Sequence, residues 1–304
     1  MSLGASDFAP VPAHTGPSDG SLRPPETLLG PALRRLKANR GAMLGLAIVL
    51  LLTVVALAAP LLARYDPVAP ALTDRLQAPG PRHWLGTDDL GRDILARLIY
   101  GARVSLQVGL ASVALALVLG VPLGAVAGYR GGWVDNLVMR AMDIMLAFPG
   151  ILLAIAIVAI LGPSLQNAML AIGIVSIPIY ARVMRGSVLA LKTKEFVDAA
   201  RSVGARDRRI LWRHLVPNCL SPLIVQATLG VATAILDAAA LSFLGLGAQP
   251  PTPEWGAMLS QGRSFLRLAP WVTLFPGLAI MLLVMGLNLL GDGLRDALDT
   301  RLGG

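Results

Sequence analysis

The chain has 304 residues, of which 55% are hydrophobic and only 14% are charged. Soluble domains carry roughly one-quarter charged residues, so this composition argues against a soluble protein and indicates a membrane protein. The net charge of +8 is also typical of nucleic-acid binding, but the basic residues gather in loops beside apolar runs, as the positive-inside rule describes. We therefore expect membrane lipid, and no nucleic acid, as a partner.

The N-terminal residues 1–29 are rich in Pro, Ser, Gly and Ala and show no hydrophobic periodicity, which predicts a disordered cytoplasmic tail. A charge-free run over 42–62 follows, and its length matches the roughly 20 apolar residues that a spanning helix needs. This run begins far into the chain, is longer than the apolar part of a signal peptide and has no convincing cleavage site. We therefore interpret it as a retained helix.

The segment that follows the first span is expected outside the membrane, because residues 64–97 balance five Arg against five Asp. It predicts a short amphipathic helix on the membrane surface, capped by Thr87 or Asp88. The apolar residues that share one face of this helix are Leu90, Ile94, Leu95, Leu98 and Ile99.

Four further apolar stretches complete the membrane-spanning part, and the second of them is long enough for two helices with a turn at 162–167. They cover 104–129, 144–181, 219–246 and 271–290. The first stretch carries Gly120, Gly124 and Gly128 at four-residue spacing, which predicts a face that a neighbouring backbone can approach closely. The predicted fold class is an all-α membrane protein with six transmembrane helices. Residues 30–100 would hold the first helix and the outside segment, and 101–304 a five-helix core.

The most informative loop lies over 192–218. Nine Lys and Arg residues over 182–213, against three acidic residues, predict a cytoplasmic loop, and six spans then place both termini in the cytoplasm. A second helix of this loop would begin at Asp207 as its N-cap and end at Pro217.

The first helix of the loop is predicted over 195–203 and ends at Gly204. Its apolar face would hold Phe196, Ala199, Ala200 and Val203. A short helix with such a narrow face suits a groove of a cytoplasmic partner, and the alternative is a helix that rests on anionic lipid head groups.

The residues Asp198-Ala199-Ala200, followed by Gly204, His214 and Pro217, resemble the EAA loop of binding-protein-dependent ABC permeases. Asp198 stands where this family usually has Glu, and the charge is kept. Three more segments, over 84–106, 240–263 and 288–302, look like those of the C-type dipeptide, oligopeptide and nickel permeases. Within the resemblance, which covers about 30–302, Thr300 replaces a common Pro and Asp237 a common Glu.

The resemblance implies a type I ABC importer permease of the bacterial inner membrane. Its partners would be a paralogous permease, two ATPase subunits and an extracytoplasmic solute-binding protein. ATP and Mg²⁺ would bind to the ATPases, with no cofactor in this chain. The substrates would be di- and oligopeptides, or alternatively nickel, glutathione or opines. The residues that the resemblance assigns to ATPase coupling are Glu195, Phe196, Asp198, Ala199, Ala200, Gly204, His214 and Pro217.

The residue patterns favour no enzyme and no metal site. No Walker A pattern occurs, so ATP hydrolysis would belong to other subunits, and we expect no catalytic residues. The histidines have no partner residues at zinc-site spacing. Asp88, Asp89 and Asp93 lack the spacing of a calcium-binding loop and have Arg92 among them, so we expect capping and ion pairing there.

Asp237 is the one charge well inside a predicted span, and such residues are usually functional. It is predicted either to contact substrate in the pathway or to pair with the neighbouring permease. An ion-coupled secondary carrier that uses this carboxylate is the alternative from a different class of transporter. A third possibility is a scaffold that transports nothing, although prolines that interrupt the spans argue for helices that line a pathway.

Overall fold

The computed structural model describes residues 29–298. The tail predicted over 1–29 lies outside the described residues except for Leu29, which begins α1, and Thr300 also lies outside them. The longer elements are α1 (Leu29–Ala38), α2 (Arg40–Leu57), α4 (Ile94–Arg130), α5 (Gly132–Leu146), α6 (Gly150–Leu161), α7 (Leu165–Leu191), α8 (Glu195–Ser202), α11 (Leu220–Phe243), α12 (Trp255–Gly262) and α13 (Trp271–Leu298). The short elements are α3 (Ala59–Leu62), α9 (Asp207–Arg209), α10 (Val216–Asn218), a π-helical turn (Ile210–Leu215) and two 3-10 turns (Leu72–Asp74 and Arg263–Phe265).

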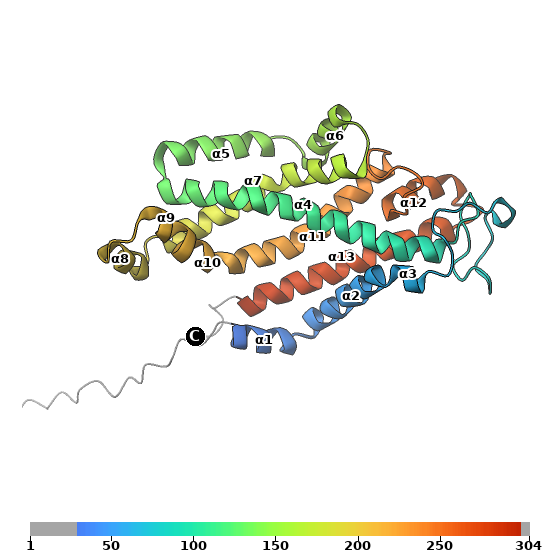
Figure 1. Ribbon diagram of the computed structural model, residues 1–304, viewed down its shortest axis with the longest axis horizontal. Helices are drawn as coiled ribbons and strands as arrows, with labels where there is room; N and C mark the ends of the chain where they lie inside the picture. The colour runs from blue at the N-terminus through green and yellow to red at the C-terminus, as the bar shows by residue number, and fades with distance from the viewer. Residues whose placement is uncertain (1–28, 299–304) are drawn as a thin grey trace, which may run out of the picture.

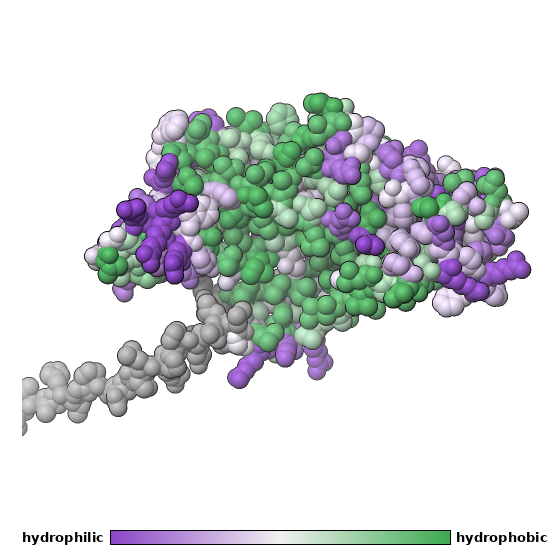
Figure 2. All heavy atoms as spheres, in the orientation of Figure 1, coloured by the Kyte–Doolittle hydropathy of each residue, from purple (hydrophilic) through white to green (hydrophobic). Residues whose placement is uncertain are grey.

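The long helices lie side by side in one elongated bundle (Figure 1). Helix α4 packs along α7 and α11, while α13 packs along α2 and α11. The loop elements α8 to α10 lie at one end of the bundle, and α12 and the segment over 63–93 lie at the other. Hydrophobic side chains cover the middle of the visible face and hydrophilic ones gather toward both ends, as expected for a protein that crosses a membrane (Figure 2).

The predicted start of the third span is wrong, because two helices meet there. The apolar run was expected to begin this span at 144, but α5 ends at Leu146 and α6 begins at Gly150, at an angle of 88° to α5. Pro149 causes the break because it has no backbone N–H and keeps Phe148, the residue before it, out of the helical region. Among the described residues, five helices are long and apolar enough to span a membrane, or six when α5 and α6 are counted as one bent span.

The surface helix predicted between the first and second spans is not a separate element. Its residues from Ile94 onward form the first turns of α4, which continues without a break for 37 residues. The predicted caps are also wrong, because the side chain of Asp93 accepts the hydrogen bond from the Ala96 N–H at 2.7 Å. Thr87 and Asp88 instead hold the preceding loop, where Asp88 accepts from the backbone N–H and the Nε of Arg92.

The glycine face of α4 is confirmed. A Cβ at Gly120 would lie 2.8 Å from the Ile177 carbonyl oxygen, and one at Gly128 would lie 2.9 Å from the Arg185 carbonyl oxygen. At Gly124 the added carbon would overlap the backbone of Ala181. Glycine at these positions therefore lets α4 and α7 approach more closely than any side chain would permit.

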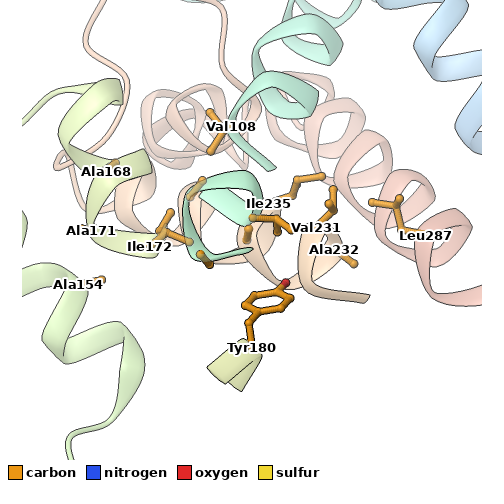
Figure 3. Close-up of a cluster of buried hydrophobic side chains, with 14 of the residues drawn as sticks. Val108, Ala154, Ala168, Ala171, Ile172, Tyr180, Val231, Ala232, Ile235 and Leu287 are labelled. Atoms are coloured by element: carbon orange, nitrogen blue, oxygen red, sulfur yellow. The ribbon is translucent and has the colours of Figure 1, made fainter. Parts of the chain in front are cut away.

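The centre of the bundle is apolar and well packed. Figure 3 shows Val108 of α4, Ile172 and Tyr180 of α7, and Val231 and Ile235 of α11 within one buried cluster. Burial of aliphatic side chains against one another holds these three helices in register. The core thereby forms a frame on which the loop between α7 and α11 is mounted.

Candidate functional site: the loop between α7 and α11

The first helix of the loop forms where the sequence predicts it. Helix α8 ends at Ser202, and Gly204 has φ +78°, a conformation that is cheap only for glycine. The Ala205 N–H donates to the Ala200 carbonyl and the Gly204 N–H to the Arg201 carbonyl. This pair of bonds is a Schellman motif, so Gly204 turns the chain sharply back toward the bundle.

The apolar face of α8 is divided between two directions, which corrects the prediction of a single face. Val197 and Ala200 are buried, and α8 packs against the π-helical turn. Phe196 is 40% exposed and Val203 84% exposed. Ala199 lies between them in sequence and is also exposed. The loop therefore anchors itself with one stripe and presents a second, small apolar stripe to its surroundings.

The acidic residues of α8 are also exposed. Asp198 lies 3.5 Å from Arg201, and their side chains are 70% and 51% exposed. Such a surface pair contributes little to stability. Glu195 is exposed in the first turn of the same helix. The carboxylates thus remain accessible beside the apolar stripe of Phe196, Ala199 and Val203.

The second half of the loop differs from the prediction. Asp207 is the first residue of α9 and makes no side-chain cap. Pro217 does not end the helical path, because it lies inside α10, and only Cys219 separates α10 from α11. A π-helical turn precedes α10. Pro217 has no backbone N–H to donate, and the wider hydrogen-bonding pattern of the π-helical turn accommodates this missing donor.

His214 is half-buried in this turn, and its carbonyl accepts from the side chain of Asn218 at 2.6 Å. The imidazole makes no hydrogen bond or ion pair with any residue over 29–298. The residues that the resemblance assigns to coupling are therefore not gathered in one place. The acidic and exposed apolar residues of α8 lie on its surface, whereas His214 and Pro217 belong to the following turns.

Two contacts that sequence reasoning missed tie the loop to the end of α4. The Tyr129 hydroxyl donates to the Asp207 carboxylate at 2.6 Å. The Lys192 ammonium donates to the Gly128 carbonyl at 3.0 Å. Neither residue has a local pattern that would mark it, because each partner lies more than sixty positions away in the sequence.

Asp237 lies apart from the loop, within α11. It is half-buried and makes no hydrogen bond or ion pair with any other residue that the structure describes. Helical spacing places Gln226 and Thr233 on the same face of α11. Leu236, the residue before Asp237, and Asn288 of α13 line an open groove of about 620 Å³.

A bundle of apolar helices with hydrophilic ends and a basic loop at one end is the architecture of a membrane-spanning protein. The chain matches the family of binding-protein-dependent transport system inner membrane components over residues 120–304. Residues 27–79 match the N-terminal transmembrane domain of oligopeptide transport permease C. The chain belongs to this family of transport permeases.

Among similar proteins, the dipeptide transport system permease protein DppC of Alkalihalophilus pseudofirmus is 56% identical over 271 residues, which are 89% of each chain. The di/tripeptide transport system permease protein DppC of Pseudomonas aeruginosa is 52% identical and matches 87% of this chain and 89% of its own. A chain of the MetNI methionine ABC transporter, in a structure described as inward facing, superposes with a TM-score of 0.55. That chain is 21% identical, with 67% of this chain and 97% of the other covered, and it establishes the type I importer fold.

Proposed function

We propose that this chain is the permease subunit of an ATP-driven importer of dipeptides and short oligopeptides in the bacterial inner membrane. The observation that carries the substrate class is the 56% identity to a dipeptide permease along 89% of both chains. The permease forms half of the pathway and catalyses no reaction itself. ATP and Mg²⁺ bind to two separate ATPase subunits, and a solute-binding protein delivers the peptide from outside.

Helix α8 is the element that the ATPase engages in this proposal. Its exposed stripe of Phe196, Ala199 and Val203 would enter a groove of the partner, with Glu195 and Asp198 available for charge-assisted contacts at the rim. The buried residues Val197 and Ala200 then carry motion of α8 into the bundle. The basic composition of 182–213 supports a cytoplasmic position for this loop, with both termini on the same side.

The second half of the pathway comes from a paralogous permease. Helices α5 and α6 and the break between them expose several large apolar side chains, including Trp133, Phe148 and Ile160, and we assign this surface to contact with the second permease. We assign Asp237 to the pathway side of α11, because a carboxylate without a partner within a span is costly unless water, substrate or another subunit reaches it. Replacement of Asp237 by Asn should then slow uptake while the assembled complex is retained.

The first test is affinity purification of the tagged chain in mild detergent, followed by mass spectrometry of the proteins that accompany it. Recovery of a second permease and two ATPases supports the proposal. Recovery of this chain alone, together with uptake that a proton gradient drives without ATP, would establish the secondary carrier instead.

The substrate is tested with the assembled complex in vesicles, its binding protein and a radiolabelled dipeptide. We expect uptake that requires ATP and Mg²⁺ and that unlabelled dipeptide abolishes. Glutathione is the informative competitor, because the glutathione transport system permease protein GsiD of Escherichia coli is 50% identical over 272 residues. Efficient competition by glutathione, with none by dipeptides, would overturn the peptide assignment.

A further inference from the structure

A small cavity lies at the end of the first span, remote from the coupling loop and from Asp237. It has a volume of about 90 Å³, and Leu62, Leu95 and Ile99 supply apolar parts of its wall. Arg64, Arg82, Trp84 and one acidic residue, Asp93, also line it. The cavity thus combines an aliphatic wall with two cationic side chains. This combination complements a phospholipid, whose acyl chains are apolar and whose phosphate is anionic.

The position of the cavity relative to the membrane follows from the first span. No charged residue lies between Arg40 and Arg64. The 23 intervening residues would measure roughly 35 Å as helix, compared with a hydrocarbon layer of about 30 Å. Arg64 is therefore at the level of the lipid phosphates when Arg40 lies at the opposite surface.

The side chains around the cavity also indicate that it lies at the level of the lipid phosphates. Leu61 is 88% exposed immediately before it, as suits a residue in contact with acyl chains, and Trp84 is 69% exposed at its edge. Tryptophan and tyrosine favour the membrane interface, where the apolar ring contacts the chains and the polar atom reaches the head groups. The cavity therefore opens where one lipid can reach both its apolar wall and its arginines.

The wall of the cavity is held in place by contacts of its own. The Tyr65 hydroxyl donates to the Arg82 carbonyl at 2.9 Å, and the Tyr65 ring lies 4.8 Å from the His83 ring. The His83 Nδ1 lies 2.9 Å from a carboxylate oxygen of Asp93. The other oxygen of Asp93 caps α4, so the one carboxylate in the cavity wall already has partners within the fold. The Arg64 guanidinium lies 5.7 Å from the centre of the Tyr65 ring, and with Arg82 it gives the wall two cations against this one carboxylate.

We propose that this cavity is a binding site for one anionic phospholipid of the outer leaflet. The phosphate and the charged head group contact Arg64 and Arg82, the start of an acyl chain enters between Leu62 and Ile99, and Trp84 packs against the chain outside. A cation pair that faces a single head group favours an anionic lipid over a zwitterionic one.

Trp84 provides the test. The full-length chain is reconstituted in phosphatidylcholine vesicles that contain increasing fractions of either brominated phosphatidylglycerol or brominated phosphatidylcholine, since bromine quenches tryptophan on contact. The difference in fluorescence between the unchanged protein and the Trp84→Phe variant gives the signal of Trp84. We expect half-quenching at a phosphatidylglycerol fraction about threefold lower than for phosphatidylcholine, consistent with two partly exposed charge contacts.

The double variant Arg64→Gln/Arg82→Gln should lose this preference. Arg75→Gln is the matched control, because Arg75 belongs to the same segment but lies over the Phe265 ring, at 5.9 Å, and does not line the cavity. Inorganic phosphate should not relieve the quenching if the ligand is a lipid. Equal quenching by both lipids, no quenching of Trp84 by either, relief by free phosphate or a preference that survives in the double variant would each overturn the proposal.

Discussion

The hydroxyl of Tyr129, at the end of α4, donates a 2.6 Å hydrogen bond to the carboxylate of Asp207, at the start of α9. This bond and the one from Lys192 to the Gly128 carbonyl connect the loop to the membrane helix that forms the centre of the bundle. Movement of the loop is therefore expected to reach α4 directly, in addition to the covalent path through α7 and α11.

Loss of the Tyr129 hydroxyl should weaken this connection without unfolding the protein. A hydrogen bond of this kind contributes about 0.5–1.5 kcal/mol, so Tyr129→Phe should lower the number of peptides transported per ATP by about two- to tenfold. The measurement is uptake and ATP hydrolysis by the same reconstituted complex. If Tyr129→Phe transports as many peptides per ATP as the unchanged protein, the bond plays no part in coupling.

Gly204 should tolerate substitution poorly for reasons of conformation alone. A Cβ there meets no atom within 4 Å, but φ is +78°, which costs a side-chain-bearing residue about 1–2 kcal/mol. Gly204→Ala should reduce recovery of the ATPases with the tagged chain, and Gly204→Pro should abolish it while the spans stay inserted.

Gly186→Ala is the matched control for Gly204. Gly186 lies within α7 and also has open space around it, but it has no positive φ, so alanine there should leave recovery unchanged. Full recovery of the ATPases and full uptake with Gly204→Pro would refute the assignment of α8 as the coupling helix.

The two stripes of α8 should respond differently to mutation. Val203→Asp should release the ATPases with no loss of thermal stability, because Val203 is 84% exposed. Val197→Ala removes buried methyl groups and should destabilise the folded loop by about 1–3 kcal/mol. Thermal unfolding in detergent, measured beside co-purification, separates the two effects. The reverse pattern would mean that the exposed stripe is not the docking face.

The buried charges of the 63–93 segment and of the first turn of α4 offer a test of stability. Asp88 lies 2.7 Å from the Arg92 Nε and 3.5 Å from the Arg97 Nε, and both arginines are buried. Asp88→Asn should destabilise the protein by about 3–5 kcal/mol, because it leaves the buried Arg97 without an ion-pair partner and Arg92 with only Asp89, at 4.0 Å.

Arg97→Met should cost much less than Asp88→Asn. The Nε and Nη2 atoms of Arg97 have no hydrogen-bond partner among the described residues, so an apolar replacement removes donors that are costly to bury. Thermal unfolding of the two variants decides between them, and an equal or larger loss for Arg97→Met would contradict this account of the cluster.

Features with a local cause could be predicted from the sequence alone. The apolar runs identify the spans because a hydrocarbon layer of about 30 Å requires a continuous apolar helix. Gly204 ends α8 as predicted because a helix that closes through positive φ needs glycine within the same few residues. The glycines of α4 indicated a close helix contact for a similar reason, since their spacing alone puts them on one face.

Only the tertiary structure decided the features that depend on distant residues. The division of the α8 face and the continuous start of α4 both depend on neighbours that the local sequence does not reveal. The clearest case is Asp207. Its position in the sequence favours an N-cap, but in the structure its carboxylate accepts a hydrogen bond from Tyr129, 78 residues away. A side chain's local preference is worth about 1 kcal/mol, and a single contact across the fold is enough to override it.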